Sequence, residues 1–107
     1  MYNIRIFYSK KERAKYISHL DINRCMQRAL KRSNLPVWFT EGFHTHIYVT
    51  FALPTPLGFE SEYEIMDFRL IKPMEMEKVV KQLGESLPEG LSIWGAGEPF
   101  MKPEKIR

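Results

Sequence analysis

The sequence is poor in the features that mark secreted and membrane-bound proteins. Its 107 residues include one cysteine, Cys25, so no internal disulfide can form and a reducing compartment is expected. No apolar run approaches the roughly 18–20 residues that a membrane-spanning helix requires. The first residues also lack the apolar core of a secretion signal. These absences predict a cytoplasmic protein with no membrane association and no disulfide-linked partner.

Catalytic and metal-binding patterns are also scarce. The segment GAGEP lacks the spacing of a phosphate-binding loop and precedes no helical pattern. His44 and His46, with His19 and Asp21, include the ligand types of a metal site, but this spacing is not specific. Ser18, His19 and Asp21 are the residue types of a hydrolytic triad, yet adjacent positions on the first turn of a helix point in different directions. We therefore expect no catalytic residues, no bound metal and no cofactor.

Positive charge is concentrated in the first third of the chain. Residues 1–35 contain nine Lys and Arg against two acidic residues, a net charge of +7, whereas residues 36–107 contain seven against eleven, a net charge of −4. Together they give the formal charge of +3 at pH 7. Such an asymmetry creates a directional electrostatic field and favours a polyanionic partner such as nucleic acid.

The pattern of apolar residues predicts an α+β fold. Strands are expected over residues 2–9, 46–53, 62–71 and 91–96, which alternate or are rich in β-branched and aromatic residues. Helical periodicity follows Ser18 and again Pro73. The order β-α-β-β-α-β predicts a ferredoxin-like split βαβ sandwich, a four-stranded antiparallel sheet with two helices on one face. We expect a single domain over residues 1–97 and a C-terminal tail over residues 98–107.

The first predicted helix separates apolar from basic residues. Ser18 is a favourable N-cap with Asp21 three residues later, and the helix should end near residues 33–34 because Pro36 follows. The apolar stripe, expected to face the core, consists of Ile22, Cys25, Met26, Ala29 and Leu30. Another face carries the basic residues Arg24, Arg28, Lys31 and Arg32.

The segment TEGFHTH, residues 40–46, combines a carboxylate, a glycine, an aromatic ring and two imidazoles. Loops positioned by a rigid sheet often carry binding residues, so we expect this segment and the start of the first helix to share one cleft. The predicted pocket residues are Ser18, His19, Asp21, Glu41, Gly42, Phe43, His44 and His46, with Arg24 beside them. Core packing is expected for most of the aromatic residues that could instead stack on bases, Tyr16, Trp38, Phe39, Phe43 and Tyr48.

The chain resembles the bacterial radical-SAM-linked domain family, a family of unknown function, in the pattern YISHLD..R..QRALKRS.LPV.FTEGF..H...TFALPTPLGFESE.E..DF. The similarity runs from about Arg5 to Leu70. The matching positions are Ser18, His19, Leu20, Asp21, Arg24, Arg28, Arg32, Thr40, Glu41, Gly42, Phe43, His46, Gly58 and Ser61. The chain departs at His44–Thr45, where the family usually has Asn-Pro, and at Ile47–Tyr48, where a proline and a basic residue are common.

The resemblance implies a functional context. Members of that family occur fused to, or beside, radical SAM proteins with a cobalamin-binding-like region, and some are fused to ribonuclease E/G-like proteins. This chain has no three-cysteine cluster for an iron–sulfur centre, so the resemblance implies an accessory domain and not the radical SAM enzyme itself. The family's domain is usually longer than this chain, and the sequence alone does not decide whether the chain is a truncated version of it.

The basic first third and the ribonuclease-like fusions both favour an accessory domain that binds structured RNA, tRNA or rRNA, for modification or processing. The residues expected to contact RNA phosphates are Lys10, Lys11, Arg13, Lys15, Arg24, Arg28, Lys31 and Arg32. Two alternatives stay open. One is a protein-interaction module whose basic helix docks on a radical SAM partner, and the other is a small-molecule or metal-binding domain at the histidines.

Overall fold

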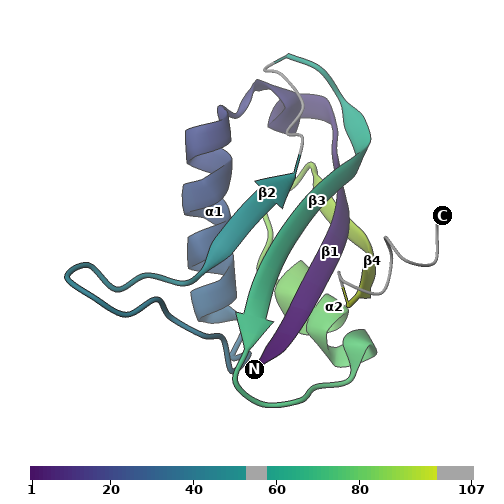
Figure 1. Ribbon diagram of the computed structural model, residues 1–107. Coiled ribbons are helices and arrows are strands. Elements are labelled where there is room, and N and C mark those ends of the chain that lie inside the picture. The colour runs from purple at the N-terminus through teal and green to yellow at the C-terminus, as the bar shows by residue number, and fades with distance from the viewer. Residues whose placement is uncertain (53–57, 99–107) are drawn as a thin grey trace, which may run out of the picture.

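The computed structural model describes residues 1–52 and 58–98, which form an antiparallel sheet with two helices on one of its faces (Figure 1). The elements along the chain are β1 (Tyr2–Lys10), the 3-10 helix η1 (Glu12–Tyr16), α1 (His19–Arg32), β2 (Val49–Ala52), β3 (Ser61–Leu70), α2 (Met76–Gly84) and β4 (Leu91–Gly97). The four strands lie in the order β2-β3-β1-β4, with every neighbouring pair antiparallel. This arrangement confirms the predicted ferredoxin-like split βαβ fold.

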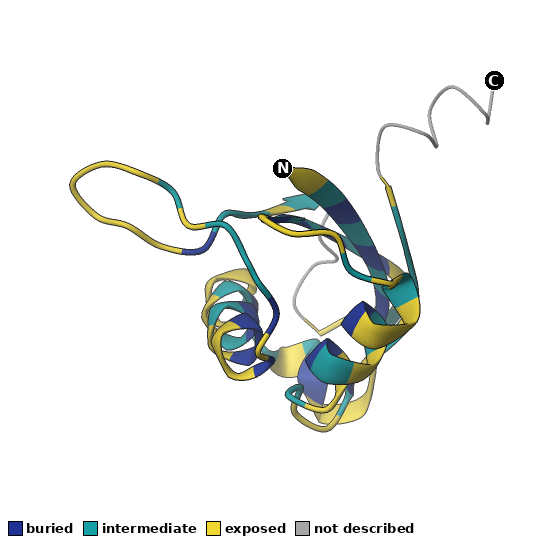
Figure 2. Cartoon of the chain, turned by 90° about the horizontal axis from the view of Figure 1, so that it is seen from below, coloured by how far each residue is buried: buried dark blue, intermediate teal, exposed yellow. Residues whose placement is uncertain are grey.

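The hydrophobic core lies between the sheet and the helices (Figure 2). Alternate residues of the central strands face it, because successive side chains of a strand point to opposite faces. Helical spacing turns one stripe of each helix toward the same layer. The buried residues of these elements are Ile4, Ile6, Tyr8, Met66, Phe68 and Leu70 on the strands, and Ile22, Met26, Ala29, Leu30, Val79 and Leu83 on the helices. Cys25 is half-buried at the margin of the predicted stripe.

Both ends of α1 lie where the sequence predicts them. Ser18 is the N-cap, and its Oγ accepts a hydrogen bond from the backbone N–H of Asp21 at 3.2 Å. At the other end Ser33 Oγ donates to the carbonyl of Leu30 at 2.7 Å. Asn34 then takes a left-handed φ of 64°, which leads the chain out of the helix. The basic residues between these ends therefore lie on a regular helix of 14 residues.

Residues 37–48 differ most from the prediction. The strand expected over residues 46–53 is limited to Val49–Ala52. The preceding residues form an antiparallel arm, which we define as residues 37–48. The bridge Phe39↔Ile47 pairs its two halves, and the bridge Val37↔Leu70 joins its first residue to β3. The arm projects from the body of the molecule beside α1 (Figure 1). Residues 46–48, which were predicted as the start of a sheet strand, therefore belong to the arm instead.

Other differences are small. The charged connection after β1 contains η1, and α2 begins at Met76, later than the predicted Pro73. No helix in the described part of the chain is long and apolar enough to cross a membrane. Within the predicted tail, residues 99–107 lie outside the described residues, as do residues 53–57. The division into a domain over residues 1–97 and a tail stays a prediction.

Candidate functional site

The exposed side of α1 carries a row of basic residues. Arg24, Arg28 and Arg32 are spaced at i, i+4 and i+8, and Lys31 lies beside them; all four are exposed. Successive arginines are about 6 Å apart along the axis, given a rise of roughly 1.5 Å per residue. Asp21 lies 3.6 Å from the Arg24 guanidinium. Among residues 1–52 and 58–98, neither Arg28 nor Lys31 forms an ion pair. We call these four basic residues the basic row.

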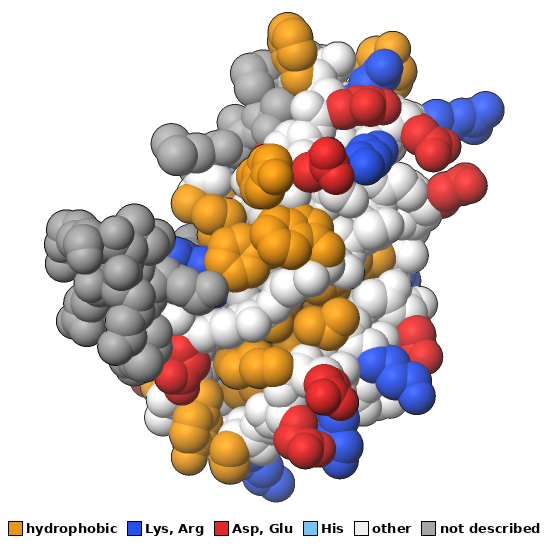
Figure 3. Space-filling model, turned by 90° about the vertical axis from the view of Figure 1, so that its right-hand side faces the viewer, with side chains coloured by type: hydrophobic (Ala, Val, Ile, Leu, Met, Phe, Trp, Pro, Cys, Tyr) orange, Lys and Arg blue, Asp and Glu red, His pale blue; other side chains and the backbone are white. Residues whose placement is uncertain are grey.

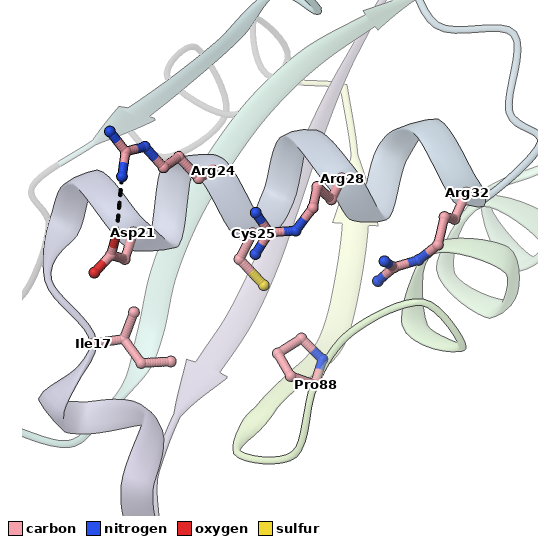
Figure 4. Close-up of a pocket in the computed structure, with 7 residues that line it drawn as sticks. All are labelled: Ile17, Asp21, Arg24, Cys25, Arg28, Arg32 and Pro88. Atoms are coloured by element: carbon pink, nitrogen blue, oxygen red, sulfur yellow. Dashed lines mark ion pairs between the residues drawn. The ribbon is translucent and has the colours of Figure 1, made fainter.

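A groove lies on each side of the basic row. The first, which we call the arginine groove, lies between α1 and the turn before β4 and has a volume of about 440 Å³ (Figure 4). Its lining consists of Ile17, Asp21, Arg24, Cys25, Arg28, Arg32 and Pro88. Arg32 also donates a hydrogen bond from Nη2 to the carbonyl of Ser86 at 2.9 Å. This bond connects the end of α1 to the opposite side of the groove.

Cys25 lies in the lining of the arginine groove between the helix and Pro88 (Figure 4). Partial burial raises the pKa of its thiol, while the positive charges of Arg28 and Arg32 act in the opposite direction. Burial is the largest of these influences, so the thiol form is favoured. The groove therefore presents guanidinium groups and a protonated thiol.

The second groove, which we call the arm groove, lies between α1 and the arm and has a volume of about 410 Å³. Its lining consists of Asn23, Arg24, Gln27, Arg28, Lys31 and His46. The arm is held there by Gln27, whose Nε2 donates to the Ile47 carbonyl at 2.7 Å and whose Oε1 accepts from the Ile47 N–H at 3.2 Å. Ile47 is fully buried. This pairing places His46, the neighbouring residue, beside three members of the basic row.

The residues of the predicted pocket are divided between four places. His46 lines the arm groove, and Asp21 lines the arginine groove. Ser18 caps the helix, and the ring of His19 packs edge-on against Phe51, with centroids 5.1 Å apart. The linings of the two grooves include neither of these residues nor any of residues 41–44. Residues 41–44 instead form the exposed tip of the arm.

The basic residues before α1 differ from the basic row in their burial and in their contacts. Lys10 is 3% exposed, because it continues the inward-facing alternation of β1, and so it does not present its charge at the surface as expected. Lys11 forms an ion pair with Glu62 at 3.3 Å. Arg13 lines a cavity that also contains two glutamates, and Lys15 lies over the ring of the neighbouring tyrosine. Of these four basic residues, Lys10 is therefore buried, Lys11 is paired with a carboxylate and Arg13 lies near two carboxylates.

Sequence reasoning missed two arrangements that position the arm. One is the pairing of Gln27 with Ile47, and no local pattern marks this glutamine. The other is Arg69 of β3, whose guanidinium lies 4.3 Å from the ring centroid of Tyr48 and 5.5 Å from that of Trp38. The two rings meet edge-on at 5.9 Å. Two of the aromatic residues considered for base stacking therefore pack at the base of the arm.

A third feature lies on the other side of the sheet. Phe7, Tyr63 and Trp94 form an aromatic cluster, in which the Trp94 ring lies 5.3 Å from Phe7 and 5.9 Å from Tyr63. Tyr63 and Trp94 are 77% and 54% exposed. Hydrophobic side chains gather in the middle of the side of the molecule that carries β4 and α2, with charged side chains toward its margins (Figure 3). We call Phe7, Tyr63 and Trp94 the sheet cluster.

The histidines do not form a metal-binding cluster in the described part of the chain. His19 lies at the start of α1, while His44 and His46 belong to the arm. His46 Nδ1 is 3.3 Å from Thr40 Oγ1 and 3.2 Å from the carbonyl oxygen of His44. Within residues 1–52 and 58–98, no group of three His, Cys, Asp or Glu residues could hold a metal ion.

Residues 3–106 match a family model described as an uncharacterized protein conserved in bacteria (DUF2344). The chain belongs to this family. No curated protein and no solved structure matches the chain. The family description assigns no activity, so function has to be argued from the basic row, the two grooves and the arm.

Proposed function

We propose that this domain binds structured RNA through the basic row of α1, as an accessory domain in RNA modification or processing. The observation that carries the proposal is the position of Arg28 and Lys31. They are exposed and form no ion pair among the described residues; Arg28 lines both grooves and Lys31 lines the arm groove. Charges that the protein leaves without partners are available to a polyanion.

The chemistry of the row suits phosphate. Guanidinium groups present several N–H donors in a planar fork that matches the oxygens of phosphate, and they stay charged at all physiological pH values. A row of such groups along one helix face can follow successive phosphates of one strand. The two grooves leave space on either side of that strand for sugars and bases.

The radical SAM context comes from the sequence resemblance alone. Radical SAM proteins and ribonuclease E/G-like proteins are the neighbours that the resemblance implies, and RNA is a substrate that both could share with this domain. We therefore propose tRNA or rRNA as the class of RNA, delivered to or held for a partner enzyme.

The proposal is tested by fluorescence anisotropy with labelled total tRNA at a series of salt concentrations. Each phosphate contact contributes roughly −0.7 to −0.9 to the slope of log K against log salt, so engagement of the whole basic row predicts a slope of about −3 to −4. In the double variant Arg28→Glu, Lys31→Glu the affinity is expected to fall at least about tenfold and the slope to become shallower by about 2.

Lys81→Glu is the matched control, because it is an exposed helical lysine on α2 that lines a surface groove next to Ala96 of β4, away from the basic row. It makes the same kind of charge reversal and is expected to leave the salt slope unchanged. Absence of tRNA binding by the wild type at low salt would remove the proposal. So would an equal loss of affinity in the Lys81→Glu control.

Docking on a protein partner is a second candidate, and the sheet cluster favours it. Two exposed aromatic rings, Tyr63 and Trp94, beside the half-buried Phe7 on one sheet face form the kind of apolar patch that marks protein interaction surfaces. The variant Tyr63→Ala, Trp94→Ala is expected to weaken binding to a radical SAM protein of the kind that the sequence resemblance implies as a partner, measured by calorimetry, and to leave affinity for tRNA unchanged. Unchanged binding to that partner in this variant would exclude the sheet cluster as its docking surface.

A further inference from the structure

Phe43 at the tip of the arm is the most exposed large apolar side chain of the described residues, at 101% of its reference area. Gly42 precedes it with a φ of 123°, a left-handed conformation that favours glycine and makes the turn that presents the ring. Among residues 1–52 and 58–98, its one aromatic neighbour is His44, whose ring stacks at 5.7 Å with an interplanar angle of 26°. Phe43 therefore contributes nothing to the core.

The arm holds this ring at a defined place relative to α1. Near the tip, Thr40 N–H donates to the carbonyl of His46 at 2.7 Å. Farther along, the side-chain amide of Gln27 binds both backbone polar groups of Ile47. At the base, Arg69 stacks on the two aromatic rings described above. Three separate contacts thus connect the arm to itself, to the helix and to the sheet.

The charges next to the arm favour an anionic ligand. Arg24, Arg28 and Lys31 line the arm groove together with His46, and no carboxylate is part of that lining. A nucleic acid strand bound on the basic row therefore passes beside the arm. A planar aromatic ring that extends from the arm is a stacking surface for a nucleobase, because every base has a π face and stacking requires no particular sequence.

We propose that Phe43, backed by the ring of His44, stacks on an unpaired base of the RNA bound at the basic row. This inference rests on the proposed function and makes it more specific. Bases inside a duplex are already stacked on their neighbours, so the ring gains contact only with a base in a loop, a bulge or a single-stranded end. The preferred ligand is then RNA with an unpaired segment next to the strand that the arginines hold.

The test compares two RNAs of equal length and charge, a hairpin with a loop of several nucleotides and a blunt duplex. Phe43→Ala is expected to lower affinity for the hairpin at least about fivefold, as for loss of one base stack. Affinity for the duplex and the salt slope on both RNAs should stay unchanged. Phe43→Trp is expected to restore hairpin affinity, because indole also stacks on bases.

Phe59→Ala is the matched control. Phe59 is also an exposed phenylalanine outside the helices and strands, 62% exposed, and it follows β2, whereas the arm precedes β2. Its removal is expected to leave affinity for both RNAs unchanged. Because Phe43 is fully exposed, its variant is expected to keep the wild-type urea unfolding midpoint, which shows that any loss of affinity is local.

The outcomes separate this inference from the proposed function. If the wild type binds neither RNA, the proposed function fails. If the wild type binds, and the basic-row variant loses affinity while Phe43→Ala binds the hairpin normally, only the stacking inference fails. An equal loss on hairpin and duplex would also overturn the inference, because a duplex offers no unpaired base. Normal RNA binding by Phe43→Ala with weaker binding to a protein partner would reassign the ring to protein docking.

Discussion

Replacing Gln27 with alanine is expected to lower the free energy of unfolding by about 2–4 kcal/mol, although Gln27 is not in the core. Ile47 forms a bridge with Phe39, while the backbone bonds of the arm run between its neighbours, Thr40 to His46 and Tyr48 to Trp38. Because antiparallel pairs alternate in this way, the N–H and C=O of Ile47 point away from the other half of the arm, toward α1. The Gln27 amide takes the place of a missing strand there.

The magnitude follows from the burial of Ile47. Without the amide, a backbone donor and a backbone acceptor of a residue with 0% exposure lose their partners. Each such group costs about 1–3 kcal/mol. Both losses together give about 2–6 kcal/mol, and we take the lower part of that range because water can reach the half-exposed arm once the side chain is removed. Such a loss is a large part of the roughly 5–15 kcal/mol that stabilises a typical domain.

Gln82→Ala is the matched control for this prediction. Gln82 is also a half-buried glutamine on a helix, but its Oε1 is buried without a hydrogen-bond partner among the described residues. Its replacement is expected to change stability by less than about 0.5 kcal/mol, or to increase it slightly, because a buried unsatisfied group is removed. Urea unfolding followed by tryptophan fluorescence measures both variants. A Gln27→Ala protein as stable as the wild type, or equal losses in the two variants, would refute the reasoning.

Three further predictions concern the helix cap, a turn and the cysteine. Ser18→Ala removes the N-cap acceptor of α1 and is expected to cost about 1 kcal/mol in urea unfolding; no change would mean that the cap is not formed. Gly90→Ala adds a Cβ that would lie 2.8 Å from that of Ala14, at a φ of 94°, and should cost at least about 2 kcal/mol. Gly58→Ala, with a similar φ of 90° but open space, should cost less; equal losses would show that the contact is irrelevant. Cys25 should react with iodoacetamide at pH 7 more slowly than a free thiol, because its raised pKa lowers the thiolate fraction, and the reaction should become faster as the pH rises. Bound tRNA should slow the reaction further. An equal rate with and without tRNA would place the RNA outside the arginine groove.

Much of the fold follows from periodicity in the sequence. The inward residues of β1 and the capped, amphipathic α1 lie where local patterns predict them, because burial on one face imposes periods of 2 and 3.6. The arm was not predicted, since it depends on Gln27, which lies 20 residues before Ile47 and has no sequence feature that separates it from any other helical glutamine. Tyr48 lies in the segment predicted as a strand, and its packing with Trp38 depends on Arg69 of β3, which is distant in the sequence.

The candidate site was predictable to a similar degree. Helical spacing alone puts the three arginines of α1 on one exposed face. A count of charges along the sequence makes Lys10 and Lys11 equivalent to these arginines. In the structure Lys10 is buried and Lys11 is paired with Glu62. The burial of Lys10 follows from the alternation of β1, in which every second side chain faces the core. The pairing of Lys11 depends on the register of β1 with β3, which the sequence does not reveal.

The anchoring of the arm below its tip has a practical consequence for protein engineering. All three attachments described above lie at or outside the Thr40–His46 pair, so a peptide inserted between these two residues would leave the attachments in place, although it would displace Phe43 from the position proposed for base stacking. Doubling the length of a flexible loop costs only about 0.6 kcal/mol of closure entropy. The tip is therefore a suitable position for an epitope tag or a genetically encoded sensor peptide.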